Sequence, residues 1–373
     1  MNESVRRRRS GGRAGNTRRE KASVLDQLDW TIPRVRDHPT EPLTEEQVAA
    51  VDAAAMRVLS EVGVDFLHPE ARAHLRDAGA EVDPDSERVR FDPALVRELV
   101  AKAPESFAIT PRNPARVVTV GGDAQLFSCI ASPPNCSDLD RGRRQGDQAA
   151  YRDFLKLTQS FNCLHLVGGY PVEPVDLHPS TRHLDCIHDK LVLTDKVCHA
   201  YALGTERVED AMELVRIAGG LSHEEFDAAP RMFTNINSSS PLKHDWPMLD
   251  GAMRMAARGQ PVMITPFTLA GAMAPVTLAG ATVQAVAEAL AAVVLLQHVR
   301  PGAPVVMGTF TSNVDMRSGA PAFGTPEYMR ATQMAGQMAR FYGLPLRASN
   351  ACAASCPDAQ AAWESAFSLW GCS

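Results

Sequence analysis

The sequence predicts an α/β fold in which parallel strands alternate with helices, preceded by a smaller amino-terminal segment. Two observations predict it: apolar, β-rich runs recur from residue 126 onward, and a stretch of helical periodicity follows most of them. Alternation of this kind indicates βαβ units and a parallel sheet. A length of 373 residues and a hydrophobic share of 45% suit one large domain of this class.

The first 21 residues differ in composition from the rest of the chain. They carry seven Arg and one Lys against two Glu, a net charge of +6, and the whole chain carries −6, so the remaining residues carry −12. We expect residues 1–21 to form a disordered basic tail, with binding to nucleic acid or to an acidic protein surface as the alternative. The acidic body argues against nucleic acid as the main partner.

Residues 22–120 predict an amino-terminal segment of helices and a small antiparallel sheet. A capping box at Thr44–Gln47 opens the first helix. We expect helices over 45–62, 69–78 and 93–102, an edge strand over 88–91, and paired strands over 107–110 and 117–120. This segment is expected to pack on the following domain, or to plug one end of it.

Residues 121–373 contain the repeating pattern. Strands are expected over 126–130, 163–168, 197–202, 231–236, 261–265, 305–310 and 346–350. Helices are expected over 148–159, 207–218, 247–258, 283–298 and 326–342. A TIM (β/α)8 barrel needs eight strands. The seven runs therefore predict an incomplete TIM barrel whose last strand is missing, as in a chain truncated at its carboxyl end. Open strand edges favour self-association, so a homo-oligomer is possible.

Several classes of site and location are disfavoured. No run of about 18 apolar residues is present, which argues against a membrane span. The eight cysteines are scattered and no export signal is visible, which favours reduced thiols in the cytoplasm. No glycine-rich nucleotide motif occurs. The spacings of Cys352 and Cys356, and of His178, His183 and His188, do not suit a zinc site, so no metal is expected.

The predicted strands end in small, aromatic or neutral polar residues, with few acids or bases. The candidate substrate-binding residues at these ends are Tyr170, Tyr201, Asn235, Asn237, Thr265, Phe267, Thr309, Arg347, Ser349 and Asn350. Such a pocket suits a polar or cationic substrate bound without proton transfer. Aromatic faces bind quaternary ammonium groups, and core packing is the alternative role for each ring. Arg347 is expected to pair with a substrate carboxylate or with an acidic side chain of the barrel.

Several motifs carry a resemblance to a known family. They are Gly343-Leu-Pro345 followed by Pro357-Asp-Ala-Gln360, Pro275–Gly280 with Glu288 in the following helix, Gly324–Glu327, and the arginine-rich start. Together they make residues 43–370 similar to the trimethylamine methyltransferase family, corrinoid-dependent methyltransferases on a TIM barrel. This resemblance covers nearly the whole chain.

The resemblance implies a chemistry and also a departure from it. The family's trimethylamine enzymes place pyrrolysine eight residues after the first Gly of Gly-Leu-Pro, and that position here is Ala351. Alanine forms no adduct with an amine, which argues against trimethylamine as the substrate and leaves the catalytic residue unassigned. The implied reaction moves a methyl group from a quaternary amine, such as a betaine, to the Co(I) of cobalamin. That corrinoid belongs to a separate partner protein, so the chain itself binds no cofactor.

Two other functions are compatible with the same pattern. A lyase or aldolase on this barrel needs an acid–base pair at the strand ends, for which Lys190 or Lys196 would be candidates. A non-catalytic binding fragment is favoured by the missing strand. A fold alone does not decide among these functions.

Overall fold

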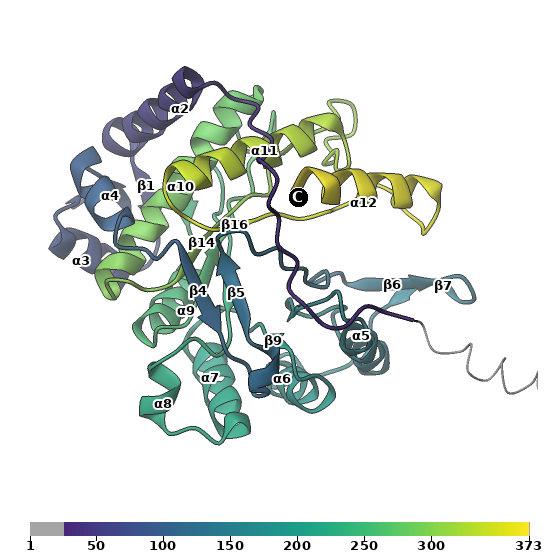
Figure 1. Cartoon of the computed structure of the whole chain (residues 1–373). Coiled ribbons are helices and arrows are strands. Elements are labelled where there is room, and N and C mark those ends of the chain that lie inside the picture. The colour runs from purple at the N-terminus through teal and green to yellow at the C-terminus, as the bar shows by residue number, and fades with distance from the viewer. Residues whose placement is uncertain (1–25, 373) are drawn as a thin grey trace, which may run out of the picture.

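The computed structural model describes residues 26–372, and the basic tail expected over residues 1–21 lies outside the described residues (Figure 1). The helices are α2 Glu45–Arg57, α3 Pro69–Ala78, α4 Pro93–Val100, α5 Gln148–Ser160, α6 Arg182–Leu193, α7 Thr205–Gly219, α8 His223–Asp227, α9 Trp246–Ala257, α10 Leu278–Val299, α11 Pro326–Phe341 and α12 Ala359–Cys372. The strands of the amino-terminal part are β1 Val64–Phe66, β2 Glu81–Val82, β3 Arg88–Arg90, β4 Ser106–Ile109, β5 Val118–Gly121, β6 Asn135–Asp138 and β7 Gly142–Gln145. The remaining strands are β8 Leu166–Val167, β9 Val197–Cys198, β10 Thr234–Ile236, β11 Lys243–His244, β12 Val262–Ile264, β13 Leu269–Ala270, β14 Val305–Gly308, β15 Ser312–Asn313 and β16 Leu346–Arg347. The fold is therefore mixed α/β, as the sequence predicts.

The predicted strands pair side by side in chain order, and every pairing is parallel. Ser128 bridges to Leu166, β8 pairs with β9, and His199 bridges to Phe233 beside β10. β10, β12, β14 and β16 then form a continuous sheet. Within residues 26–372, no pairing connects β16 back to the segment around Ser128, and no closed barrel is formed.

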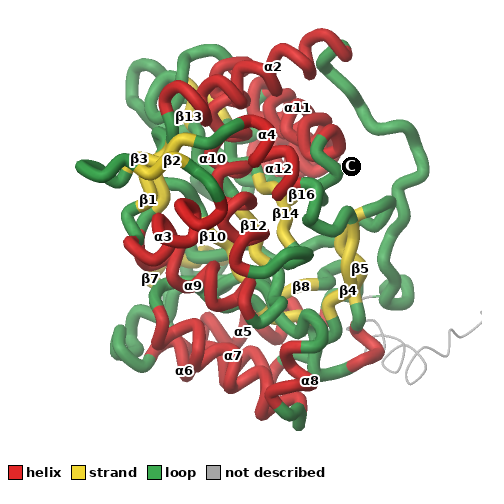
Figure 2. Tube along the Cα trace, turned by 90° about the vertical axis from the view of Figure 1, so that its left-hand side faces the viewer, coloured by secondary structure: helices red, strands yellow, loops and turns green. Residues whose placement is uncertain are grey.

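The two faces of these strands contact different parts of the protein. Side chains of one face, such as Ile236, Ile264 and Met307, pack with α7, α9 and α10 in the main hydrophobic core. The opposite face is called here the inner face. Its apolar side chains form a second hydrophobic cluster with the β4–β5 hairpin. Leu166, Val197, Phe233, Met263 and Val306 are its inner-face members. The hairpin thus covers the amino-terminal ends of the strands, and the carboxyl ends remain for a site (Figures 1 and 2).

The amino-terminal part contains one difference from expectation. The strand over residues 88–91 was expected at an edge, but β3 pairs with both β1 and β2 in a sheet of order β11-β1-β3-β2. The edge prediction was wrong because β1 pairs in turn with β11, a strand nearly 180 residues later that no local pattern links to it. The charged segment after Ser132 forms the β6–β7 hairpin, which projects from the body in Figure 1.

Helix α10 is the most apolar of the helices in the described chain. Its length and composition would allow it to cross a membrane, yet 78% of its apolar window is buried inside the protein. It contacts α2, α3, α4, α9 and α11. These contacts show that its hydropathy reflects burial between the amino-terminal helices and the parallel sheet, as in a core helix of a globular protein.

Candidate functional site

The inner face changes character along the strands. The apolar residues near the β4–β5 hairpin are followed, two positions further along each strand, by His199, Asn235, Thr265 and Gly308. Because side chains alternate along a strand, these residues share the face of Val197, Phe233, Met263 and Val306. Arg347 is the register partner of Gly308 and faces the same way. His199, Asn235, Thr265 and Arg347 are called here the polar layer.

Arg347 is the charged member of the polar layer. Within residues 26–372, its guanidinium makes no hydrogen bond or ion pair. Burial lowers the pKa of Arg347, while nearby Tyr328 and Cys372 act in the opposite direction. The acidic barrel residue that the sequence allowed as its partner is not found in the described part of the chain. Arg347 is half-buried. A partly desolvated cation without a counter-ion is unfavourable, and this arrangement is suited to an anionic ligand.

The other members of the polar layer contain buried atoms without partners. His199 Nε2 accepts a hydrogen bond from the backbone N–H of Asn235 at 3.2 Å, so the neutral ring carries its proton on Nδ1. Burial and the charges of Lys190 and Arg347 hold the pKa of His199 well below its usual range, so the ring is neutral. Within the described residues, His199 Nδ1, Asn235 Oδ1 and Thr265 Oγ1 lack hydrogen-bond partners. Unsatisfied buried groups of this kind cost about 1–3 kcal/mol each and mark a place adapted to something other than stability.

Aromatic rings lie beyond the polar layer, in the segments that follow β12 and β14. Phe267 and Phe310 stack with centroids 4.9 Å apart. Phe323 contacts Phe310 at 5.0 Å and Tyr328 at 5.4 Å. The Tyr328 hydroxyl bonds both the carbonyl and the hydroxyl of Ser349. The structure therefore brings the predicted residues Phe267 and Ser349 into one aromatic cluster at the carboxyl ends of the last strands.

Three predicted residues are engaged differently. Thr309 lies on the opposite face from Gly308, is buried, and bonds Thr311 at 3.4 Å. The Asn350 amide donates to Ser365 in α12 at 2.7 Å. The backbone N–H of Asn237 contacts the sulfur of Met248 at 3.2 Å, and the residue is exposed.

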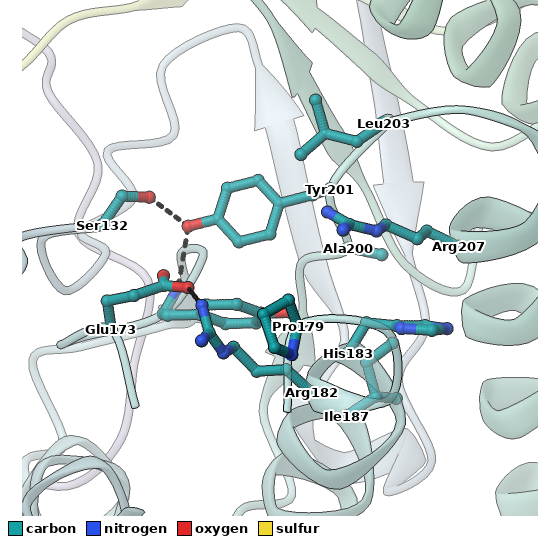
Figure 3. A pocket seen from close by; sticks show the side chains of 11 residues that line it. Ser132, Glu173, Pro179, Arg182, His183, Ile187, Ala200, Tyr201, Leu203 and Arg207 are labelled. Atoms are coloured by element: carbon teal, nitrogen blue, oxygen red, sulfur yellow. Dashed lines mark hydrogen bonds and ion pairs between the residues drawn. The ribbon is translucent and has the colours of Figure 1, made fainter. Parts of the chain in front are cut away.

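Tyr170 and Tyr201 form a separate part of the site. Their ring centroids lie 4.7 Å apart in an edge-to-face arrangement, and the backbone N–H of Tyr170 donates to the Tyr201 hydroxyl at 3.0 Å. Both rings line a cavity of about 230 Å³, called here the rim cavity (Figure 3). The other residues that line it are Ser132, Glu173, Pro179, Arg182, His183, Ile187, Ala200, Leu203 and Arg207. The Tyr201 hydroxyl also bonds Ser132, whose φ of 66° is unusual for a non-glycine residue.

The position of Tyr201 depends on Gly169. This residue has a φ of +54°, and a Cβ at this position would lie 2.5 Å from the Tyr201 hydroxyl and 2.6 Å from Cβ of Ala131. We expect Gly169→Ala to displace Tyr201 and to lower the free energy of unfolding by about 1–3 kcal/mol, measured by urea denaturation. Gly122→Ala is the matched control, since Gly122 has a φ of +62° with nothing within 4 Å of its Cβ. Equal losses in both variants would show that φ alone matters and that the contact with Tyr201 does not.

A buried carboxylate holds the loop that follows β10. The chain leaves the polar layer at Asn237, where this loop begins. Glu288 of α10 is fully buried and accepts hydrogen bonds from the hydroxyls of Ser238 and Ser240. It also accepts from the backbone N–H of Leu242 at 2.7 Å and from Gln284 at 2.8 Å. Four donors within the described residues therefore satisfy this carboxylate, which ties the loop after β10 to α10.

The loop carrying Ala351 is held in a similar manner. Glu364 of α12 accepts the backbone N–H groups of Ala353 at 2.7 Å and Ala354 at 3.1 Å, and Gln360 donates to its other oxygen at 2.7 Å. These contacts tie the loop after β16 to α12. They position the backbone at Ala351 close to the aromatic cluster.

Sequence reasoning missed four residues of these sites. His199 lies in the predicted strand over 197–202, and the signal that identifies it is its position two residues before Tyr201, which places both side chains on one face. Tyr328, Arg182 and Arg207 belong to helices, and only tertiary packing brings them to the strand ends. No group of three or more His, Cys, Asp or Glu in residues 26–372 is arranged to hold a metal ion.

Comparisons with known proteins assign the family. The family model described as trimethylamine methyltransferase (MTTB) matches residues 8–373. The chain is 35% identical over 328 residues to a glycine betaine methyltransferase of Desulfitobacterium hafniense, covering 88% of this chain and 68% of that protein. It is 29% identical to a proline betaine:corrinoid methyltransferase of Eubacterium limosum, covering 83% of this chain and 65% of the relative. It is 27% identical to trimethylamine methyltransferase MttB of Methanosarcina thermophila, covering 86% and 68%. The chain belongs to the trimethylamine methyltransferase family.

Proposed function

We propose that this chain moves a methyl group from a betaine, a quaternary amine that carries a carboxylate, to the cobalt of a corrinoid held by a separate protein. The observation that carries the proposal is Arg347. The side chain of Arg347 is half-buried at the carboxyl end of β16 and has no anionic partner within the described residues. The names of two similar proteins, which act on glycine betaine and proline betaine, support the same substrate class.

The chemistry agrees with the residue at position 351. A quaternary ammonium leaves as a neutral amine, whereas a neutral tertiary amine would have to leave as an amide anion. The quaternary substrate therefore needs no covalent activation, and Ala351 supplies none. The corrinoid supplies the reduced cobalt that accepts the methyl group. The residues of this chain bind the substrate, orient one methyl group and exclude water.

The polar layer and the aromatic cluster divide the recognition of such a substrate. Arg347 pairs with the carboxylate, and a bidentate pair fixes the orientation of the molecule. Phe267 and Phe310 offer ring faces to the quaternary ammonium. His199 Nδ1 and Thr265 Oγ1, which lack partners, gain them when the ligand or its ordered water enters the layer. Asn235, Asn237, Ser349, Tyr170 and Tyr201 remain proposed members of the same pocket, as do Thr309 and Asn350 in supporting positions.

We also propose that the parallel strands belong to a TIM (β/α)8 barrel. The order of pairing, from the segment at Ser128 to β16, and the hairpin that covers the amino-terminal ends support it. In such a barrel the active site lies at the carboxyl ends of the strands. A cytoplasmic location, and self-association through exposed strand edges, are retained as part of the proposal.

The ammonium groups of the two lysines considered for a lyase or aldolase donate to backbone carbonyls. Lys190 is fully buried and donates to the carbonyl of His199 at 2.8 Å. Burial lowers the pKa of Lys196 to about 8. Lys196 directly precedes β9, and its ammonium donates to the carbonyls of Thr158 and Phe161. This arrangement favours structural roles for both lysines over a role in a lyase or aldolase.

The direct test is methylation of cobalt. The chain is incubated with a reduced corrinoid protein and a panel of glycine betaine, proline betaine, trimethylamine and tetramethylammonium, and the cobalt spectrum is followed. We expect methyl–cobalt to form with a betaine and not with trimethylamine. Calorimetric binding of each amine is measured in parallel. Turnover of trimethylamine, or the absence of betaine binding, would contradict the proposal.

A further inference from the structure

We propose that His199 determines the specificity of the polar layer by donating a hydrogen bond from Nδ1 to the carboxylate of the betaine, opposite Arg347. This role of His199 rests on the proposed function, because it requires a substrate that carries a carboxylate. A carboxylate has about four acceptor positions, and one bidentate guanidinium occupies two of them. A further donor is therefore needed to satisfy a carboxylate that has been removed from water.

The tautomer of His199 is fixed by a neighbouring group that can only donate. The backbone N–H of Asn235 points at Nε2 at 3.2 Å, and a backbone N–H has no acceptor capacity. The neutral ring therefore carries its proton on Nδ1. His199 is 2% exposed, and its Nδ1 has no hydrogen-bond partner within residues 26–372. The ring thus presents a buried donor to the polar layer.

A second buried histidine, His165, has both of its ring nitrogens satisfied. Its Nδ1 accepts a hydrogen bond from the backbone N–H of Phe127 at 3.0 Å, and its Nε2 lies 3.0 Å from the carbonyl oxygen of Thr31. His165 is fully buried, and backbone groups alone complete its hydrogen bonds. Because an unsatisfied buried donor is unfavourable, the contrast between the two rings indicates that Nδ1 of His199 is adapted to a ligand.

His199 and Arg347 act on one another across the inner face. In the order of pairing, β10, β12 and β14 separate the strands that carry them. Arg347 nevertheless contributes, after burial and the charge of Lys190, to lowering the pKa of His199. Thr265 Oγ1 lies against Gly308, the register partner of Arg347, where a Cβ would collide with it. Donors from the ends of β9, β12 and β16 therefore face one region of the inner face.

A neutral ring suits a zwitterionic substrate better than a charged ring. The charges that act on His199 are those of Arg347 and of Lys190, whose ammonium donates to the His199 carbonyl from α6. Tyr201 packs edge-to-face on the ring, and burial raises the pKa of its phenol, so it carries no charge at neutral pH. A second cation beside Arg347 would repel the quaternary ammonium of a betaine, whereas a neutral N–H binds the carboxylate without this repulsion.

Two substitutions separate the donor at Nδ1 from the rest of the ring. Asparagine places its amide nitrogen near the position of Nδ1, whereas the longer glutamine places its amide near the position of Nε2. Both variants lose the packing of the ring, so that loss cancels in their comparison. We expect His199→Gln to bind glycine betaine about tenfold or more weakly than His199→Asn, the effect of one hydrogen bond to a charged group. Calorimetric titration measures it, and tetramethylammonium, which has no carboxylate, should bind both variants equally.

A matched control and a measurement on the unchanged chain complete the test. His165→Gln removes a buried histidine whose nitrogens are satisfied, so it should lower the melting temperature and leave the affinity for glycine betaine unchanged. In the unchanged chain, proton uptake on betaine binding is measured at about pH 6.5, the ordinary pKa of histidine, in two buffers of different ionisation enthalpy. We expect no uptake, because His199 donates as a neutral ring.

The outcomes separate this role of His199 from the proposed function. Equal affinities of His199→Asn and His199→Gln for glycine betaine, or proton uptake on binding, would overturn the role of Nδ1 and leave the substrate class in place. Failure of the unchanged chain to bind glycine betaine would instead contradict the proposed function, and the role of His199 with it.

Discussion

Replacing Arg347 with alanine is expected to weaken the binding of betaines by on the order of 2–5 kcal/mol, the loss typical of a desolvated charge pair. Arg347 has no anionic partner within the described residues, so the substrate carboxylate supplies its counter-ion. Binding of tetramethylammonium, which has no carboxylate, should change much less. Arg347→Lys keeps the charge but loses the bidentate geometry. Its affinity for betaines should therefore lie between that of the unchanged chain and that of Arg347→Ala. Calorimetric titration of each variant with both ligands measures the effect.

The stability of the same variants separates binding from structure. A guanidinium without a partner leaves no broken ion pair behind, so the free energy of unfolding should not fall in Arg347→Ala. Arg317→Ala, at an exposed position in the turn after β15, is the matched control. If both ligand types lose affinity equally, or neither does, Arg347 is a structural residue and the carboxylate hypothesis is wrong.

The largest effect on stability is expected at Glu288. Replacing it with alanine leaves the donors of Ser238, Ser240, Leu242 and Gln284 without their acceptor inside the protein. The expected loss in the free energy of unfolding is on the order of 3–5 kcal/mol. Urea denaturation measures it.

Two further variants interpret the Glu288 result. Glu288→Gln retains one acceptor but introduces a donor that faces other donors. Its loss in the free energy of unfolding should therefore be smaller than that of Glu288→Ala but still measurable. Glu87→Ala removes an exposed carboxylate with no side-chain partner in the described structure and should be near neutral. A loss in Glu288→Ala no larger than in Glu87→Ala would show that the loop after β10 does not depend on this carboxylate.

The sequence alone predicted most of the segments that form the parallel strands. Apolar runs such as 261–265 and 305–310 are buried on both sides, and their β-branched composition distinguishes them from helices without knowledge of the partners. Alternation then places Asn235, Thr265 and Arg347 at the strand ends, because side chains two positions apart point the same way. The family resemblance came from local motifs, and the comparisons confirm it.

The tertiary structure decided which elements pair and which side chains meet, and the alternation of residues within one strand carries no information on either. The pairing of β1 with β11 joins residues far apart in the chain, so the expected edge position of β3 was wrong. Arg347 has no ion-pair partner within residues 26–372, and this depends on every side chain packed around it. The rim cavity joins the starts of α6 and α7 to Tyr201, and helix starts have no periodicity that reports what lies beside them. Contacts of this kind depend on how whole elements pack, so local sequence patterns predict the elements but not the site between them.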